Sequence, residues 1–412
     1  MKYKILLVEH DAASLRVLKR IIGKINLDVV VATSLTEAKL IFESSTPESF
    51  LCAVVDYSLP DALHGEAIDF AIASFIPVIV LTSLPDDDVR KRILSKAVVD
   101  YIPKQNRQVF EYLSRLLTRL EKNKKVGVLV VGKRPSSRNK VCELLNRHNF
   151  ETFQANNTHD AIETLYENNL IKLVITENEL KDETGIELVA AIRKEFSKEE
   201  VSIIGTSNLR QPALLAKFIK SGANDYLREP YCHEEFFCRV VQNIEHIEQI
   251  DVIRKTANTD YLTGLPNRRH FFEEVSSSIK RGLDSMCLAL MDLDHFKQIN
   301  DTHGHDCGDV VLKEVSKLMK KHFAAFPMSR FGGEEFCVFF PNMGKEQAIQ
   351  TIDAFRLKVA DKKIRRKRQT ISCTVSIGLT ALNADKIELM LSQADECLYK
   401  AKSRGRNQIV ST

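Results

Sequence analysis

Two acidic clusters in the last third of this 412-residue sequence could bind metal. An apolar run, Leu288–Met291, ends in the acids Asp292 and Asp294, of which only one is expected to face a site. That acid could hold Mg²⁺ together with a nearby backbone carbonyl, because hard cations take oxygen ligands. A predicted hairpin over Ser329–Phe340 has the tip sequence GGEE. Glycines at a tip let the backbone approach a ligand closely, and the adjacent acids suit divalent metals.

A basic cluster follows near the C-terminus. Lys400, Lys402, Arg404 and Arg406 lie on a predicted helix end and turn, where they could meet phosphate groups. Metal-binding acids and phosphate-binding bases together predict a site for a nucleotide and a metal.

The first 104 residues carry a different set of polar residues, each placed after an apolar run. These residues are Glu9, His10, Asp11, Asp56, Thr82 and Lys104. The carboxyl ends of parallel strands meet at one edge of a sheet, so the set would converge there. A carboxylate, a hydroxyl and an ammonium could then accept a phosphoryl group and neutralise its charge. Spacing alone leaves open that each is a solvated loop residue.

Short apolar runs alternate with amphipathic helical patterns around these residues, which predicts parallel sheets covered on both faces. The expected strands are Ile5–Val8, Val29–Ala32, Ala53–Val55, Pro77–Leu81 and Val99–Ile102. The pattern repeats about 120 residues later, which is the size of a domain. The repeated strands are Val126–Val131, Leu173–Thr176 and Val201–Gly205.

A helical pattern runs from Phe236 to Thr256 without Gly or Pro. It fits a connecting helix that pairs with a second copy, and equally the last helix of the second domain packing on its own sheet. We predict an N-terminal domain (1–120), a middle domain (125–245), a helical linker (246–258) and a C-terminal α/β domain (259–412).

Bulk composition limits the class of partner. The net charge of +4 gives no reason to expect nucleic acid or membrane as the principal partner. No run approaches the ~18 apolar residues of a membrane helix. Nine scattered cysteines without metal-ligand spacing suit a reducing compartment, so we expect a cytoplasmic protein.

The N-terminal domain resembles the receiver domains of response regulators. The matching segments are VEHD at Val8–Asp11, DYSLP at Asp56–Pro60, LTS at Leu81–Ser83 and DYIPK at Asp100–Lys104. The resemblance implies a doubly wound, flavodoxin-like sheet and a histidine kinase or phosphotransfer protein as partner. It makes Asp56 the phosphoacceptor, Thr82 and Tyr101 the switch residues and Lys104 the phosphate-pairing lysine. His10 stands where the family has the second acid of its metal corner (here Glu9, His10 and Asp11), so Mg²⁺ binding is left open, with Asp11 as a substitute ligand.

The middle domain keeps the receiver pattern without its chemistry. Glu177 stands at the phosphoacceptor position and Glu229 at the lysine position, while Thr206 retains the hydroxyl. Lys133 could pair with Glu177. No phosphorylation is expected here.

The C-terminal domain resembles the GGDEF family, the diguanylate cyclases, over its whole length. The matching segments are DYLTGLPNRR at Asp260–Arg269, MDLDHFKQINDTHGHDCGD at Met291–Asp309, RFGGEEF at Arg330–Phe336 and YKAKSRGRN at Tyr399–Asn407. The resemblance implies an α/β nucleotidyl-cyclase-like fold and a cytoplasmic, phosphorylation-regulated enzyme that joins two GTP molecules into cyclic di-GMP as a homodimer.

The same resemblance assigns roles within the site. Asp292, Glu334 and the Leu293 carbonyl would hold two Mg²⁺ (or Mn²⁺) ions, and Glu335 is the candidate general base or a residue that orients the metal ligands. The expected GTP-binding residues are Phe296, Lys297, Asn300, Asp309, Lys402 and Arg406. Product-inhibited members carry an RxxD motif where this chain has Phe323–Phe326, so inhibition by product is expected to be weak or absent.

Two other functions remain open. One is a silent scaffold or cyclic di-GMP receptor, against which the retained site residues and the missing RxxD motif argue. The other is a cyclase that makes an adenine-containing dinucleotide. Asp309, suited to the N–H groups of guanine, argues for GTP.

Overall fold

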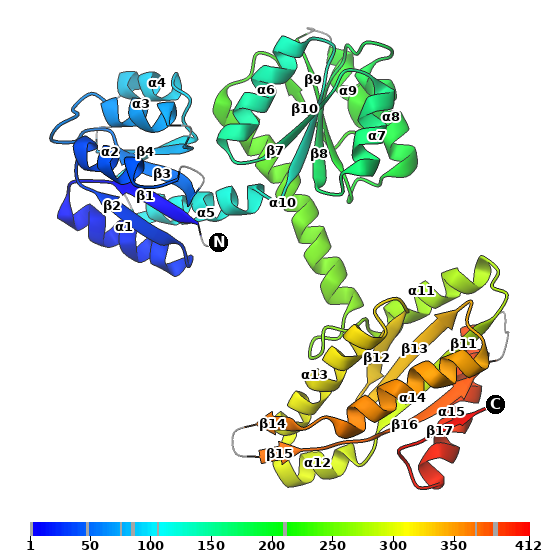
Figure 1. The fold of residues 1–412 in the computed structure, drawn as a ribbon. Coiled ribbons are helices and arrows are strands. Elements are labelled where there is room, and N and C mark those ends of the chain that lie inside the picture. The colour runs from blue at the N-terminus through cyan, green and yellow to red at the C-terminus, as the bar shows by residue number, and fades with distance from the viewer. Residues whose placement is uncertain are drawn as a thin grey trace. The chain divides into compact units, whose positions relative to one another are not determined.

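A computed structural model describes residues 3–412 apart from 47–48, 75, 84–86, 105–106, 209–211, 367–368 and 382–385. The chain divides into two compact units, Met1–Ile250 and Asp251–Thr412. The first unit holds the N-terminal and middle domains, each built on its own sheet, and the second unit holds the C-terminal domain (Figure 1).

The N-terminal domain has a five-stranded parallel sheet in the order β2-β1-β3-β4-β5. Its strands are β1 (Lys4–Val8), β2 (Asp28–Ala32), β3 (Phe50–Asp56), β4 (Val78–Thr82) and β5 (Asp100–Pro103). Its helices are α1 (Ala12–Lys24), α2 (Leu35–Glu43), α3 (Glu66–Ala73), α4 (Asp87–Leu94) and α5 (Arg107–Asn123). Every residue of β3 is buried, as expected for a strand between two helical layers. The five predicted strands are confirmed to within a few residues.

The middle domain repeats this topology, with its sheet in the order β10-β9-β8-β6-β7. Its strands are β6 (Gly127–Val131), β7 (Glu151–Ala155), β8 (Ile171–Glu177), β9 (Ser202–Ser207) and β10 (Asp225–Arg228). Its helices are α6 (Pro135–Arg147), α7 (Thr158–Glu167), α8 (Gly185–Glu195), α9 (Pro212–Ser221) and α10 (His233–Asn258). Figure 1 shows α6 on one side of the sheet and α7 and α8 on the other.

Helix α10 has two different halves. Phe236, Val240 and Ile244 are buried in the core of the middle domain, so the first half is that domain's last helix. Val252 and Ile253, in the second half, are 62% and 65% exposed. The prediction that this helix packs on the sheet of the middle domain is therefore confirmed for the first half. Pairing with a second copy remains a prediction for the second half.

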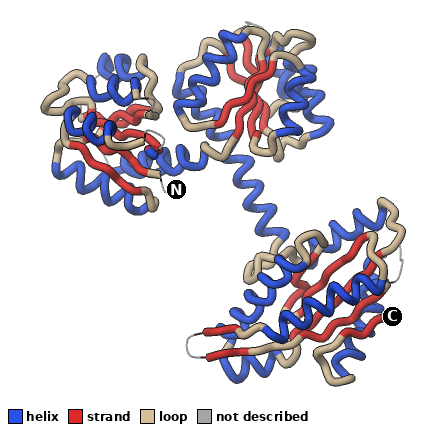
Figure 2. The backbone as a smooth tube through the Cα atoms, in the orientation of Figure 1, coloured by secondary structure: helices blue, strands red, loops and turns tan. Residues whose placement is uncertain are grey.

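The C-terminal domain has a five-stranded mixed sheet in the order β12-β13-β11-β16-β17. Its strands are β11 (Met286–Leu293), β12 (Met328–Gly332), β13 (Glu335–Pro341), β14 (Ile364–Arg366), β15 (Gln369–Ile371), β16 (Val375–Thr380) and β17 (Ile409–Ser411), of which β14 and β15 form a separate pair. Its helices are α11 (Arg268–Lys280), α12 (Phe296–His303), α13 (His305–His322), α14 (Lys345–Asp361) and α15 (Ile387–Ser403). One core joins the sheet to α13 and α14, and another joins it to α11 and α15 (Figure 2).

Candidate active site and receiver pockets

Strand pairing brings three acids to one end of the C-terminal sheet. Asp292 lies near the end of β11 and is paired directly with Glu335, the first residue of β13. Residues paired this way across an antiparallel ladder share a face, so the two carboxylates lie on the same side. Glu334 occupies the turn between β12 and β13, and its carbonyl accepts a hydrogen bond from the Leu293 amide at 3.3 Å. The predicted hairpin is confirmed, with Gly332 and Gly333 at its tip.

An arginine and an aspartate hold this turn in place. Arg330 donates from Nε and Nη2 to the Gly333 carbonyl at 2.9 and 2.6 Å, and from Nη1 to Asp260 Oδ1 at 2.9 Å. Gly333 has a φ of +48°, a left-handed conformation that favours glycine. The sequence alone assigned no role to Arg330 or Asp260. Each lies in a motif that was used only as evidence of family resemblance, and the two residues are 70 positions apart.

Lys402 compensates part of the negative charge of the three acids Asp292, Glu334 and Glu335. Its Nζ lies 2.8 Å from Asp292 Oδ2. Burial raises the pKa of Asp292 above its usual range, Lys402 lowers it in part, and the charges of Glu334 and Glu335 raise it further. A buried carboxylate with a raised pKa, facing two more acids, is stabilised by a bound cation.

The second acid of the motif has a structural role. Asp294 accepts hydrogen bonds from Thr374 Oγ1 and Ser376 Oγ, both at 2.6 Å, and from the Asn407 amide at 3.1 Å. Its carboxylate therefore joins the end of β11 to β16 and to the loop before β17. Of the two acids, only Asp292 faces the glutamates.

The expected guanine-binding residues lie on neighbouring helices. Asn300 is on α12, and its Oδ1 lies only 1.9 Å from where a Cβ on Gly308 would be. A side chain at position 308 could not coexist with Asn300 in this position. Gly308 thus lets α13 approach α12, and it directly precedes the exposed Asp309. This role of Gly308 was missed, because the residue reads in the sequence only as one glycine inside a helix.

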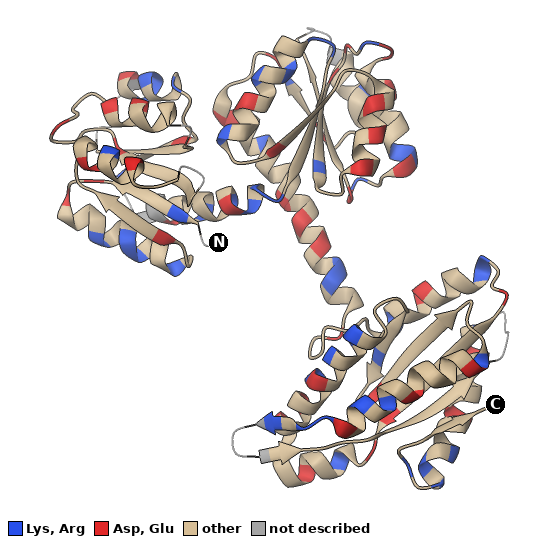
Figure 3. Ribbon diagram, viewed as in Figure 1, with Lys and Arg blue, Asp and Glu red and all other residues tan. Residues whose placement is uncertain are grey.

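The expected phosphate-binding cations come from two segments. Lys297 is exposed in the first turn of α12, directly after Phe296, which is buried in the domain core. Arg406 is exposed in a left-handed turn after α15, with φ of +113° at Gly405 and +64° at Arg406. Figure 3 marks Lys and Arg positions in blue on the ribbon along the end of α15 and this turn.

The segment Phe323–Phe326 directly follows α13 and is apolar where the inhibitory motif would be polar. Phe323 is fully buried and packs against Phe340 and Phe355. The ring of Phe326 lies 5.0 Å from that of Phe340. Neither side chain offers a hydrogen bond or a charge to a ligand.

The N-terminal domain gathers its polar residues at the carboxyl edge of the sheet. Lys104 Nζ lies 2.7 Å from Asp56 Oδ2 and 2.5 Å from Glu9 Oε2. Burial raises the pKa of Asp56, and Lys104 opposes that shift. Thr82 is buried at the end of β4, and Tyr101 lies on the neighbouring strand β5, where it is paired with Val80. Asp11 is elsewhere engaged: it accepts from the Ser14 amide at 2.7 Å and caps α1.

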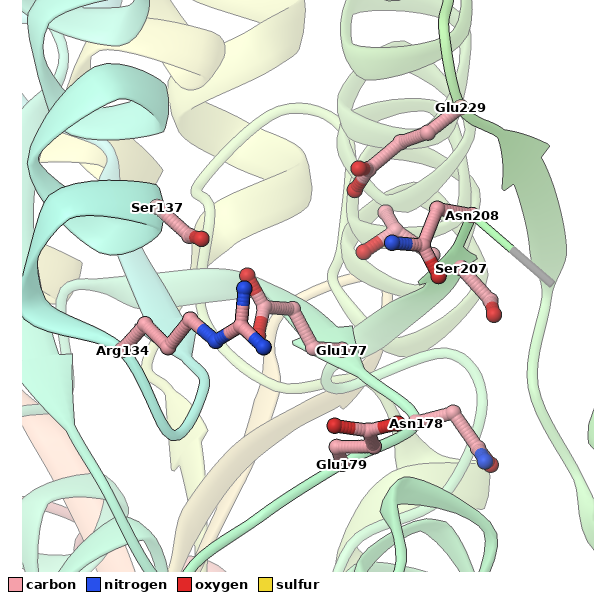
Figure 4. Close-up of a pocket in the computed structure, with 9 residues that line it drawn as sticks. Arg134, Ser137, Glu177, Asn178, Glu179, Ser207, Asn208 and Glu229 are labelled. Carbon is pink, nitrogen blue, oxygen red and sulfur yellow. The ribbon is translucent and has the colours of Figure 1, made fainter.

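The corresponding pocket of the middle domain is filled differently (Figure 4). A Cβ on Gly132, the counterpart of Glu9, would lie 2.7 Å from Glu177 Cδ, so the Glu177 side chain occupies the space above this glycine. Burial raises the pKa of Glu177, Ser137 and Arg134 lower it, and Glu229 raises it. The expected pair with Lys133 is not formed; Arg134 points toward Glu177 instead.

Sheet register corrects one further expectation for the middle domain. The Lys104 amide donates to the Thr82 carbonyl, and the Glu229 amide donates to the Ser207 carbonyl in the same way. Ser207, not Thr206, is therefore the counterpart of Thr82. The sequence match slipped by one residue because β9 carries two adjacent hydroxyl side chains.

Family models match two segments of the chain. Residues 257–408 match the family described as diguanylate cyclase, GGDEF domain, and residues 128–241 match the response regulator receiver domain. The second match falls on the middle domain, the one without an aspartate at the phosphoacceptor position.

Among the described residues, no helix is long and apolar enough to cross a membrane.

Curated relatives match part of their own length. The response regulator PleD of Caulobacter vibrioides is 33% identical over 255 residues, which cover 58% of this chain and 56% of PleD. The diguanylate cyclase DgcP of Pseudomonas aeruginosa is 40% identical over 162 residues, 38% of this chain and 24% of that protein. The chain thus spans little more than half of PleD.

A solved structure described as a two-component system response regulator/GGDEF domain protein is matched over its whole length. It is 33% identical, covers 60% of this chain and superposes with a TM-score of 0.54. The chain therefore belongs to the response regulators that combine a receiver domain with a GGDEF domain.

Proposed function

We propose that the C-terminal domain condenses two GTP molecules into cyclic di-GMP with release of two pyrophosphates. The observation that carries this proposal is the convergence of Asp292, Glu334, Glu335 and Lys402 at one end of the sheet. The GGDEF family match and the name of the relative DgcP support it.

Guanine recognition is assigned to Asn300 and Asp309. An amide both donates and accepts, and a carboxylate accepts from two N–H groups, which complements the carbonyl and the N–H edge of guanine. Adenine presents no such pair of N–H donors to a carboxylate. The close approach of α12 and α13 at Gly308 supports this assignment.

The donor set fits Mg²⁺ or Mn²⁺. The carboxylates of Asp292 and Glu334 and the carbonyl of Leu293 are hard oxygen ligands. When bound, two such ions per GTP would polarise the α-phosphate and lower the pKa of the attacking ribose 3′-hydroxyl. Lys297, Lys402 and Arg406 would hold the β- and γ-phosphates, and Glu335 would accept the proton of the attacking hydroxyl.

Two copies of the domain are required by the stoichiometry. Each domain holds one GTP and the product joins two, so two domains must face one another, each supplying the hydroxyl that attacks the other's phosphate. Holding both substrates in this way is a proximity effect. Phosphorylation of Asp56 by a histidine kinase or phosphotransfer protein would favour the productive dimer; the Lys104–Asp56 contact supports this role.

Mass spectrometry of reaction products separates this proposal from the other two functions. The purified full-length chain is incubated with Mg²⁺ and GTP, ATP or both, and Asp292→Asn serves as the inactive control. We expect cyclic di-GMP from GTP alone and no adenine-containing product. If no cyclic dinucleotide forms, even after treatment with acetyl phosphate or beryllofluoride, the proposed function is wrong and a scaffold or receptor is favoured.

A further inference from the structure

A cluster of three metal-ligand side chains lies at the carboxyl edge of the N-terminal sheet. Glu9, His10 and Asp56 each offer one ligand atom, and these atoms lie within 4.8 Å of one another. Glu9 and Asp56 are buried, whereas His10 is 44% exposed on its side chain. Of these three described side chains, His10 is therefore the one that is open to solvent.

The distances suit a small cation. His10 Nδ1 lies 3.7 Å from Glu9 Oε1 and 3.6 Å from Asp56 Oδ2. Ligands about 2.1 Å from a tetrahedral ion are about 3.4 Å apart, so the two His10 distances exceed that spacing by only a few tenths of an ångström. Glu9 Oε1 also accepts from the Asp11 amide at 2.9 Å, which orients the carboxylate.

The donor set does not fit Mg²⁺ well. A receiver metal corner with two acids and the phosphoacceptor would offer only oxygen, but here one of the three donors is an imidazole nitrogen. Mg²⁺ prefers oxygen and gives up its water reluctantly, whereas imidazole suits zinc, cobalt and nickel. Asp11 cannot restore an all-oxygen set from its present position, because its carboxylate caps α1.

We propose that Glu9, His10 and Asp56 form a binding site for a divalent transition-metal ion, and that His10 makes this site prefer such an ion to Mg²⁺. The imidazole binds through Nδ1, the nitrogen within 3.7 Å of both carboxylates, with its proton on Nε2. The ion takes Asp56 Oδ2 from Lys104, which keeps its contact with Glu9 Oε2. Binding depends neither on phosphorylation nor on cyclase activity, so its failure would leave the proposed function intact.

Co²⁺ absorption and calorimetry test the proposal on the full-length chain. Wild type is compared with His10→Ala and His10→Asp by visible d–d absorption of Co²⁺, and by calorimetric titration with Zn²⁺ and with Mg²⁺. We expect His10→Ala to lose one bound equivalent of Co²⁺ or to weaken it by at least about tenfold. We expect His10→Asp to lose the His10-dependent Co²⁺ signal and to bind one equivalent of Mg²⁺ more than wild type, whose C-terminal domain is itself proposed to bind Mg²⁺.

Exposed thiols provide the control. Cys232 and Cys238 are exposed and could bind Co²⁺ themselves. The Cys232→Ser/Cys238→Ser variant should keep the His10-dependent signal. The proposal is overturned if wild type and His10→Ala bind Co²⁺ and Zn²⁺ alike, or if wild type gives the same Mg²⁺ binding heat as His10→Asp.

Discussion

The charged carboxylate of Asp292 destabilises the folded chain, although the proposed reaction requires it. It is only 7% exposed and faces Glu334 and Glu335, so burial and like charge both raise its pKa, and Lys402 offsets only part of this. A raised pKa in the folded state means that stability is lost as pH rises from the ordinary value of 3.8 through the raised one. At neutral pH, the free energy of unfolding is therefore lowered by this charge.

We predict that Asp292→Asn abolishes cyclase activity yet raises Tm at pH 7 in Mg²⁺-free buffer. Added Mg²⁺ should raise the Tm of wild type and not that of the variant, since it binds the folded carboxylate. Differential scanning calorimetry measures both effects, with the exposed Glu274→Gln as the matched control. A lower Tm for Asp292→Asn than for wild type would contradict the electrostatic account of this residue.

Glu335 has two candidate roles that kinetics can separate. As the general base, its change to Gln should lower kcat by at least about 100-fold while leaving the Mg²⁺ concentration for half-maximal rate unchanged. As a residue that orients the metal ligands, it should shift that Mg²⁺ concentration. We predict the first result. Steady-state rates over a range of Mg²⁺ and GTP concentrations decide, and a shift in Mg²⁺ dependence alone would contradict the base role.

At the scale of elements, the approach of α12 to α13 positions the residues that we propose to bind guanine. Gly308→Ala would place a Cβ 1.9 Å from Asn300 Oδ1, so Asn300 must move. We predict a rise of about tenfold in KM for GTP, the value of one hydrogen bond of about 1.4 kcal/mol. Gly344→Ala is the control, because a Cβ at that position would have no neighbour within 4 Å and its φ is −74°. An unchanged KM in Gly308→Ala would remove this role from Asn300.

The segment Phe323–Phe326, directly after α13, lacks the polar residues that product inhibition would need. Phe323 and Phe326 pack into the aromatic cluster around Phe340. We predict that progress curves of pyrophosphate release stay linear until GTP is nearly consumed, and that added cyclic di-GMP leaves the initial rate unchanged. Inhibition at micromolar product would show that another surface of the chain binds it.

Periodicity predicts the elements better than it predicts the contacts between them. Strands such as β3 and β8 contain runs of buried apolar residues, so the sequence locates them to within a few residues. The Arg330–Asp260 contact joins segments that are distant in the sequence. The fit of Asn300 against Gly308 depends on how closely two helices approach. No local sequence pattern encodes either contact. The Thr206 assignment was wrong because neighbouring hydroxyls are equivalent in sequence, and only register distinguishes them.

At the scale of the whole molecule, the proposed reaction requires two chains to meet, so we predict that activity depends on protein concentration. Val252 and Ile253 on α10 are exposed, and we predict that this part of the helix pairs with a second copy. Phosphorylation of Asp56 would act on the same equilibrium. The N-terminal domain carries the complete Asp56–Lys104–Thr82 set, whereas the middle domain has glutamates in two of these three positions. We therefore predict that control by phosphorylation acts through the N-terminal domain.

The most direct test of the account is the rate of cyclic di-GMP formation from GTP as a function of protein concentration, for wild type and Asp56→Ala, with and without beryllofluoride. The account predicts a specific activity that rises with concentration and then levels off. Beryllofluoride should move this rise to lower concentration in wild type and leave Asp56→Ala unchanged. A specific activity independent of concentration down to the nanomolar range, in a chain that sediments as a monomer, would contradict an active site completed by a second copy.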